Sequence, residues 1–190
     1  MQEPMTRGSL ILNAATYSDV LCDEAGVRRV RHGLSQELRR ALSTMSSTAW
    51  YPRAYYVEVL RGIVQVHNEP SQSYLDVVRC GRTVFEKEAN TLMKLLLRVM
   101  NVRLFLRKFP DFWAQDMVGG TLRVDCSQIE RNEATLLVTE VAGFEHLGPL
   151  CVGFAGRALE QVIGKQVDAT QMGWSFDAPD ADKVTLRFSW

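Results

Sequence analysis

Residues 121–141 read TLRVDCSQIERNEATLLVTEV, and this stretch decides the fold. In its first part, Leu122, Val124 and Cys126 alternate with polar residues, which is the period-two pattern of a half-buried strand. A polar turn over Ser127–Glu133 follows, and Ala134–Val141 contains the β-branched residues that strands favour. The stretch therefore predicts two neighbouring strands joined by a short turn.

A helix and two more strands are expected after this pair. Helical spacing returns over Leu147–Ile163 and ends at Gly164, a residue type that commonly terminates helices. Val167–Phe176 predicts a third strand, and Asp177–Asp180 has the composition of a turn. The order is therefore strand, strand, helix, strand, strand.

The last strand carries the clearest alternation in the chain. Its apolar positions are Val184, Leu186, Phe188 and Trp190, which predicts that Trp190 lies in the core. Because short polar turns join the members of each strand pair, we expect one four-stranded antiparallel sheet. With helices on one face of this sheet, the fold class is α+β.

The residues before Gly119-Gly120 have helical rather than alternating spacing, and no low-complexity linker separates the two parts. We predict one domain, with a helical half over 1–118 and a half of sheet plus helix over 119–190. Thr83–Met100 is apolar over much of its circumference, which predicts the central buried helix. The other expected helices are Leu10–Ala25, a short one capped by Ser35, one starting at Trp50-Tyr51-Pro52, one from Ser71 to about Gly81, and one from Val102 that Pro110 breaks.

Composition excludes several classes of function. The 190 residues include 22 basic and 22 acidic side chains, so no overall field favours nucleic acid. No stretch approaches the roughly 20 apolar residues that span a bilayer, and the first eight residues lack the apolar core of a secretion signal. We therefore expect a cytoplasmic protein, whose scattered cysteines are free thiols.

Motifs that carry enzyme chemistry are absent from the sequence. There is no phosphate-cradling glycine loop, nucleophile elbow or zinc-ligand spacing. His146 lies five positions before Cys151, so a cysteine–histidine nucleophile is conceivable, but Cys151 falls on an apolar helix face where cysteine acts as a small hydrophobe. We expect neither an enzyme nor a metal site.

Aromatic and large apolar residues gather around the expected middle helices. An apolar site between these helices and the sheet would take a lipophilic small molecule, whereas a closed core would leave no site. The expected lining is Trp50, Tyr51, Tyr55, Phe85, Met93, Phe105 and Phe109. Cys80, beside Gly81 at an expected helix end, is a candidate for acylation.

Trp50-Tyr51-Pro52, the apolar middle helix and the closing Ser189-Trp190 resemble a family of uncharacterised myxobacterial proteins. The second half is also similar to vinyl-reductase-type small-molecule-binding domains, haem-nitric-oxide-binding domains and TRAPP subunits. This resemblance implies helices packed on a four-stranded sheet, with a ligand or acyl chain between them or a dimeric scaffold. Haem-binding members use a proximal histidine and a Tyr-x-Ser-x-Arg clamp, which Tyr17-Ser18-Asp19 does not match, so we expect no cofactor.

Two functions follow from these observations. The leading one is a non-enzymatic sensory domain that binds a small molecule or an acyl chain. The alternative is a protein–protein adaptor, as a homodimer or with a protein partner, which predicts a contiguous exposed apolar patch. The arginine-rich residues 28–40 are either a docking face or a solvated helix surface.

Overall fold

The computed structural model describes residues 3–21, 24–66, 69–172 and 182–190. The helices are α1 (Gly8–Leu21), α2 (Glu24–Gly33), α3 (Gln36–Thr44), α4 (Arg53–Val64), α5 (Pro70–Glu88), α6 (Thr91–Val99), α7 (Val102–Asp116) and α8 (Leu147–Ile163). The strands are β1 (Met5–Arg7), β2 (Trp50–Pro52), β3 (Met117–Val118), β4 (Thr121–Asp125), β5 (Glu133–Thr139), β6 (Asp168–Met172) and β7 (Lys183–Ser189), and a 3-10 turn spans Ile129–Arg131.

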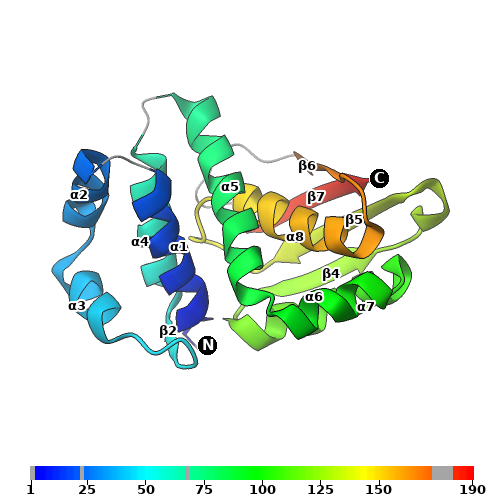
Figure 1. Cartoon of the computed structure of the whole chain (residues 1–190), viewed down its shortest axis with the longest axis horizontal. Helices are drawn as coiled ribbons and strands as arrows, with labels where there is room; N and C mark the ends of the chain where they lie inside the picture. Colours follow the sequence, from blue (N-terminus) through cyan, green and yellow to red (C-terminus); the bar gives the residue numbers. More distant parts are fainter. Residues whose placement is uncertain (1–2, 22–23, 67–68, 173–181) are drawn as a thin grey trace.

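The second half forms the expected four-stranded antiparallel sheet, in the order β4-β5-β7-β6. Leu136 pairs with Leu186 and Val138 with Val184 across β5 and β7, and these side chains are buried on one face. Helix α8 packs on this sheet, and Figure 1 shows it between the strands and α5. The α+β class and the strand–strand–helix–strand–strand order are confirmed. The predicted turn at Asp177–Asp180 lies outside the described residues.

The structure also contains a three-stranded sheet, in the order β2-β1-β3, which the sequence did not predict. Trp50-Tyr51-Pro52 was expected to start a helix, but these residues form β2 and pair with Arg7, Thr6 and Met5, while α4 begins at Arg53. Strands of two or three residues are too short to show a period, so no alternation in the sequence announces them.

The expected end of a helix near Gly81 was wrong, because α5 continues through this residue to Glu88. Gly81 instead lets α8 approach closely, since a Cβ there would lie 2.1 Å from the backbone oxygen of Leu150. The chain breaks later, at Asn90, whose side chain accepts a hydrogen bond from the backbone N–H of Met93 and caps α6. The single helix over Thr83–Met100 is therefore two helices.

The expectation that Thr83–Met100 is the central buried helix is wrong for its second part, which is α6. Of its residues only Leu97 is buried, while Leu92 is 65% exposed and Val99 is 83% exposed. The helices at the centre of the molecule are α5 and α8, which contact each other more than any other pair of elements (Figure 1).

Three smaller predictions also need correction. The expected helix over Leu10–Ala25 is divided between α1, which ends at Leu21, and α2, which starts at Glu24. Pro110 does not break α7, which runs through it. Trp190 is half-buried and packs against the edge of the core rather than within it. None of the helices in the described residues is long and apolar enough to span a membrane.

Candidate functional site

One wall of the candidate site is a stripe on α7. Phe109, Phe112, Trp113 and Asp116 recur at the i, i+3, i+4, i+7 spacing that places side chains on one face of a helix. Phe105, one turn earlier on the same face, packs against Phe109 and Phe112, with ring centroids 5.4 and 6.2 Å apart. The stripe therefore presents aromatic rings and one carboxyl group to the sheet half.

The opposite walls come from α8 and the buried face of the sheet. On α8 the spacing again puts one set of side chains on one face, and on the strands alternate residues point inward. Together with the stripe on α7 and residues from α1, α4 and β3, they enclose a cavity of about 70 Å³. Its lining is Leu10, Tyr56, Phe109, Phe112, Trp113, Asp116, Met117, Leu122, Leu136, Val138, Leu147, Leu150, Cys151, Phe154, Ala155 and Leu186.

Few polar groups belong to this lining, and the apolar surroundings disfavour charge on them. Burial raises the pKa of the Cys151 thiol to about 12, and burial together with the nearby charge of Glu88 raises the pKa of Asp116 to about 6. Burial also raises the pKa of the Tyr56 hydroxyl. The indole N–H of Trp113 is buried and has no hydrogen-bond acceptor among the described residues. The cavity therefore suits a neutral, apolar molecule.

The volume sets an upper bound on what fits without movement. A cavity of about 150 Å³ lined by aliphatic and aromatic residues holds one benzene molecule. At about 70 Å³, this cavity admits a smaller molecule or the end of a slim chain. A larger guest requires α7 and α8 to separate.

The structure brings together only part of the lining that the sequence predicted. Phe109 lines the cavity, and Phe105 packs against it. Phe85 lies on α5 and meets the ring of Phe154 edge-on, with centroids 5.4 Å apart. Met93 is half-buried on α6.

The other predicted lining residues, on β2 and α4, lie outside the cavity lining. Trp50 and Tyr51 belong to β2, where the Trp50 ring stacks under the guanidinium of Arg7 at 4.2 Å. The hydroxyl of Tyr55 donates a hydrogen bond to Glu37. None of the three lines the cavity between α7, α8 and the sheet. Their role in ligand binding stays a prediction.

Cysteine chemistry is constrained by burial. Cys80 is fully buried, and burial raises the pKa of its thiol far above the usual range. His146 precedes α8, and burial lowers the pKa of its imidazole, while the carboxylate of Glu145 lies 3.9 Å from its Nε2 atom. The low thiolate population of Cys80 and Cys151 at neutral pH gives no support to acylation or to nucleophilic attack.

Most of the cavity lining was visible in the sequence but was interpreted as ordinary core. The stripe over Phe109–Asp116 and that over Leu147–Ala155 both have helical spacing, and Leu122, Val138 and Leu186 have strand spacing. Spacing shows which residues share a face, but it does not show whether two facing surfaces close on each other.

Comparisons with known proteins identify the fold. Neither a protein-family model nor a curated protein matches the sequence. Among solved structures, the unliganded Fe(II) H-NOX protein from K. algicida aligns with a TM-score of 0.69 at 10% identity, over 96% of this chain and 95% of that one. A Cs H-NOX mutant that carries 4-cyano-L-phenylalanine aligns with a TM-score of 0.62 at 8% identity over 92% of both chains. A single-residue mutant of T. tengcongensis H-NOX gives 0.57 at 8% identity over 93% of this chain and 94% of the other.

The H-NOX fold implies a haem, and the cavity residues do not fit one. No histidine lines the cavity. The described residues contain no cluster of three or more histidine, cysteine or acidic side chains that could hold a metal ion. A porphyrin is several times larger than benzene, which already needs about twice this volume. The chain therefore has the H-NOX fold, with a cavity whose lining contains no histidine and whose volume is too small for a haem.

Proposed function

We propose that this chain is a non-enzymatic binding domain of H-NOX fold that takes a small apolar molecule, or the end of an acyl chain, in the cavity between α7, α8 and the sheet. The observation that carries the proposal is the enclosed, almost wholly apolar cavity. One of its lining residues, Trp113, also has a buried indole N–H that lacks an acceptor among the described residues. A buried donor without a partner costs free energy, and a ligand carbonyl or hydroxyl would remove that cost.

Binding would be driven mainly by burial of the ligand's apolar surface, at about 25 cal/mol per Å². A hydrogen bond to Trp113 adds about 1 kcal/mol and orients the ligand. A carboxylate ligand is disfavoured near Asp116, whose pKa of about 6 leaves it largely ionised at neutral pH. The preferred ligand is therefore neutral.

A sensory response would pass through α7. Phe109 and Trp113 face the cavity, while Leu104 near the start of the same helix is 44% exposed. A ligand larger than about 70 Å³ would displace α7 and with it this exposed end. A binding event in the interior thereby changes a surface that a partner could read.

Native mass spectrometry of the purified protein, before and after denaturation, tests this function. We expect a non-covalent mass excess that disappears on unfolding, or saturable binding of 1-hexanol when the protein is purified bare. Trp113→Phe should weaken hexanol binding about fivefold, which is the loss of one hydrogen bond of about 1 kcal/mol. Trp50→Phe is the matched control, because Trp50 lies in β2 outside the cavity. A bare protein that binds neither hexanol nor the smaller 1-propanol would sink the proposal.

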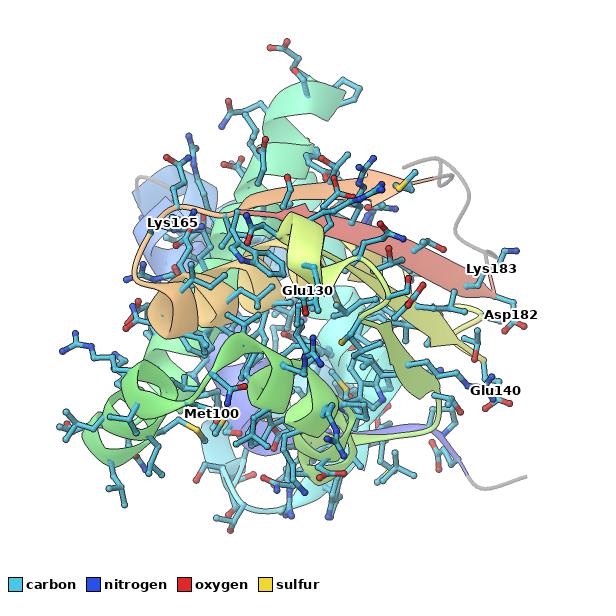
Figure 2. All side chains as sticks on the ribbon, turned by 90° about the vertical axis from the view of Figure 1, so that its right-hand side faces the viewer. Met100, Glu130, Glu140, Lys165, Asp182 and Lys183 are labelled. Atoms are coloured by element: carbon cyan, nitrogen blue, oxygen red, sulfur yellow. The ribbon has the colours of Figure 1, made fainter. Side chains whose placement is uncertain are left out.

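A second candidate function is an interaction module that uses α6. Its exposed aliphatic residues have the i, i+3, i+4, i+7 spacing that helices normally bury, and Figure 2 shows this end of the molecule, with Met100 between α6 and α7 and Lys165 beyond the end of α8. The outward stripe is Leu92, Leu95, Leu96 and Val99.

The charges around this stripe indicate its partner. Residues 91–110 contain five basic side chains and no acidic one. Lys94, Arg103 and Lys108 are paired with acids from outside this range, which leaves Arg98 and Arg107 outside the described ion pairs. Two copies meeting through this stripe would bring like charges together, which disfavours a symmetric dimer here. We propose instead a protein partner with an apolar groove and an acidic rim, into which α6 inserts.

Sedimentation and binding measurements distinguish between a protein partner, a second copy of the chain and a lipid surface as the binding partner of this stripe. We expect the protein to sediment as a monomer and to retain a partner protein when it is immobilised. The purified partner should bind the Leu96→Glu variant at least tenfold more weakly than it binds the wild type. A Leu75→Glu variant, changed at an exposed leucine of α5 instead, should keep full affinity. A dimer that Leu96→Glu dissociates, or retention on anionic vesicles, would replace the protein partner with a second copy or a lipid surface.

A further inference from the structure

Arg53 is a buried cation that has no carboxylate partner in the part of the chain that the structure describes. Arg53 is only 7% exposed, yet none of the described ion pairs includes it. Its single described side-chain hydrogen bond, from Nη1 to the backbone oxygen of Gly119, is long at 3.5 Å, and the guanidinium lies 5.2 Å from the ring centroid of Phe144. Arginine is rarely buried without a paired acid, because desolvating a lone charge is costly.

The backbone around Arg53 adds positive potential. Arg53 is the first residue of the twelve-residue helix α4, and Pro52 at the N-cap offers no side-chain acceptor to the first turn. The Arg53 backbone N–H donates to the backbone oxygen of Pro4 at 3.0 Å. No side chain caps the other N–H groups of that first turn. The N-terminus of a helix carries a partial positive charge and attracts anions.

A cavity of about 200 Å³ lies against both features. It is lined by Glu3, Pro4, Pro52, Arg53, Ala54, Val57 and Gly143. Three of these residues, including Arg53 itself, belong to the first turns of α4, so the cavity lies at the start of this helix. A Cβ placed on Gly143 would meet no atom within 4 Å, so the space above this residue is open. The volume exceeds the roughly 150 Å³ that holds a benzene ring.

We propose that this cavity is a binding site for a small oxyanion, a phosphate or a carboxylate group, paired with the Arg53 guanidinium and the N-terminus of α4. The planar guanidinium presents two parallel N–H donors that match either anion. The site is distinct from the apolar cavity, since the two share no lining residue. It does not depend on the function proposed above.

Folding of the N-terminal segment builds this site. Pro52 pairs with Met5 in the three-stranded sheet, and the Arg53 N–H holds Pro4 in place. Glu3, exposed at the rim, is the only acid among the described lining residues, and its charge opposes an incoming anion. Bound oxyanion should therefore stabilise the fold by mass action.

Thermal unfolding and calorimetry at constant ionic strength test the proposal, with inorganic phosphate, acetate and sodium chloride as separate titrants. We expect saturable binding and a raised melting temperature with phosphate or acetate, and neither with chloride. The stronger of the first two identifies the head group that the site prefers. Glu3→Gln should bind the same anion about fivefold more tightly, because it removes the opposing charge at an exposed position.

Two arginine variants complete the experiment. Arg53→Met should abolish anion binding and, without anion, should melt no lower than the wild type, because it removes an unpaired buried charge. Arg53→Lys keeps the charge but loses the two-pronged donor, and should bind at least tenfold more weakly. Arg98→Met, at an exposed position on α6, is the control and should bind as the wild type does. Anion binding that is unchanged in Arg53→Met, or absent from both wild type and Glu3→Gln, would overturn the proposal.

Discussion

Gly81 of α5 and Leu150 of α8 meet backbone to backbone, so that a Cβ on Gly81 would lie 2.1 Å from the oxygen of Leu150. The contact is reciprocal, because a Cβ on Gly153 of α8 would lie 1.9 Å from the backbone oxygen of Val78 in α5. Two glycines, one on each helix, therefore set the distance between the central helices. Since α8 also forms a wall of the apolar cavity, this contact fixes one side of the candidate site.

Replacing either glycine should force the two helices apart. We expect Gly81→Ala and Gly153→Ala each to lower the free energy of unfolding by about 3 kcal/mol. Gly156→Ala is the control on the same helix, because its Cβ would meet Ala169 at an ordinary 3.5 Å and alanine favours helices by about 1 kcal/mol over glycine. Urea denaturation of the three variants measures the difference, and equal stabilities for Gly81→Ala and Gly156→Ala would contradict the tight contact.

Asp116 should make the protein less stable as the pH rises. Burial, and then the charge of Glu88, raises its pKa from 3.8 to about 6, so the folded state binds the proton more tightly than the unfolded state does. The stabilisation from protonated Asp116 is fully present below pH 3.8 and is lost as the pH rises to about 6. Asp116→Asn should therefore be more stable than the wild type at pH 8, by about 1 kcal/mol after allowance for solvent screening.

The comparison at pH 4 supplies the control for Asp116. There the wild-type carboxyl group is largely protonated in the folded state, and the two proteins should unfold at nearly the same urea concentration. An advantage of Asp116→Asn that is equal at pH 4 and pH 8 would show that removal of the charge is not its cause.

Glu160 should have the opposite pH dependence. Burial alone would raise its pKa, but hydrogen bonds from Arg82 and Arg157 outweigh burial and lower it. The stabilisation is present above the unfolded value of 4.5 and is lost as the pH falls through the lower folded value. Glu160→Gln should cost about 1 kcal/mol at pH 7 and less at pH 3, measured by urea denaturation. Glu130→Gln, which removes an exposed pair with Arg103, should have no effect at either pH.

The described thiols should differ in reactivity. Cys126 and Cys151 are both half-buried, and burial raises the pKa of all three described thiols, to about 12 for Cys151 and higher still for the fully buried Cys80. Native labelling with iodoacetamide, followed by peptide mass mapping, should modify Cys126 at least tenfold faster than the other two. Rapid labelling of Cys151 would favour the enzymatic alternative with His146, which the proposed binding function rejects.

The sheet half was predictable because its strands are long enough to show a period. In β5 and β7, buried residues alternate with less buried ones over seven positions, and a one-residue shift would expose the whole apolar set. The three-stranded sheet has no such signal. Its strands are two or three residues long and are paired by contacts that join Met5 to Pro52 and to Val118.

The helical half and the cavity were only partly predictable, for two physical reasons. Glycine commonly ends a helix, but Gly81 serves instead to let α5 and α8 approach each other. That role depends on Leu150, a residue far along the chain whose position the sequence does not reveal. The exposed stripe of α6 has the spacing of a buried face, since apolar periodicity does not indicate whether a partner surface exists.

The order of the large sheet has a consequence for synthesis on the ribosome. β7 follows all the other described strands in the sequence, yet it lies between β5 and β6 and supplies the hydrogen bonds that join them. Glu133 and Arg187, which pair across this junction, are 54 positions apart. Until β7 emerges, β5 and β6 each present an unpaired edge, and edges of this kind invite association with other chains. The nascent protein is therefore most vulnerable to aggregation after its helices have formed and just before its sheet can close.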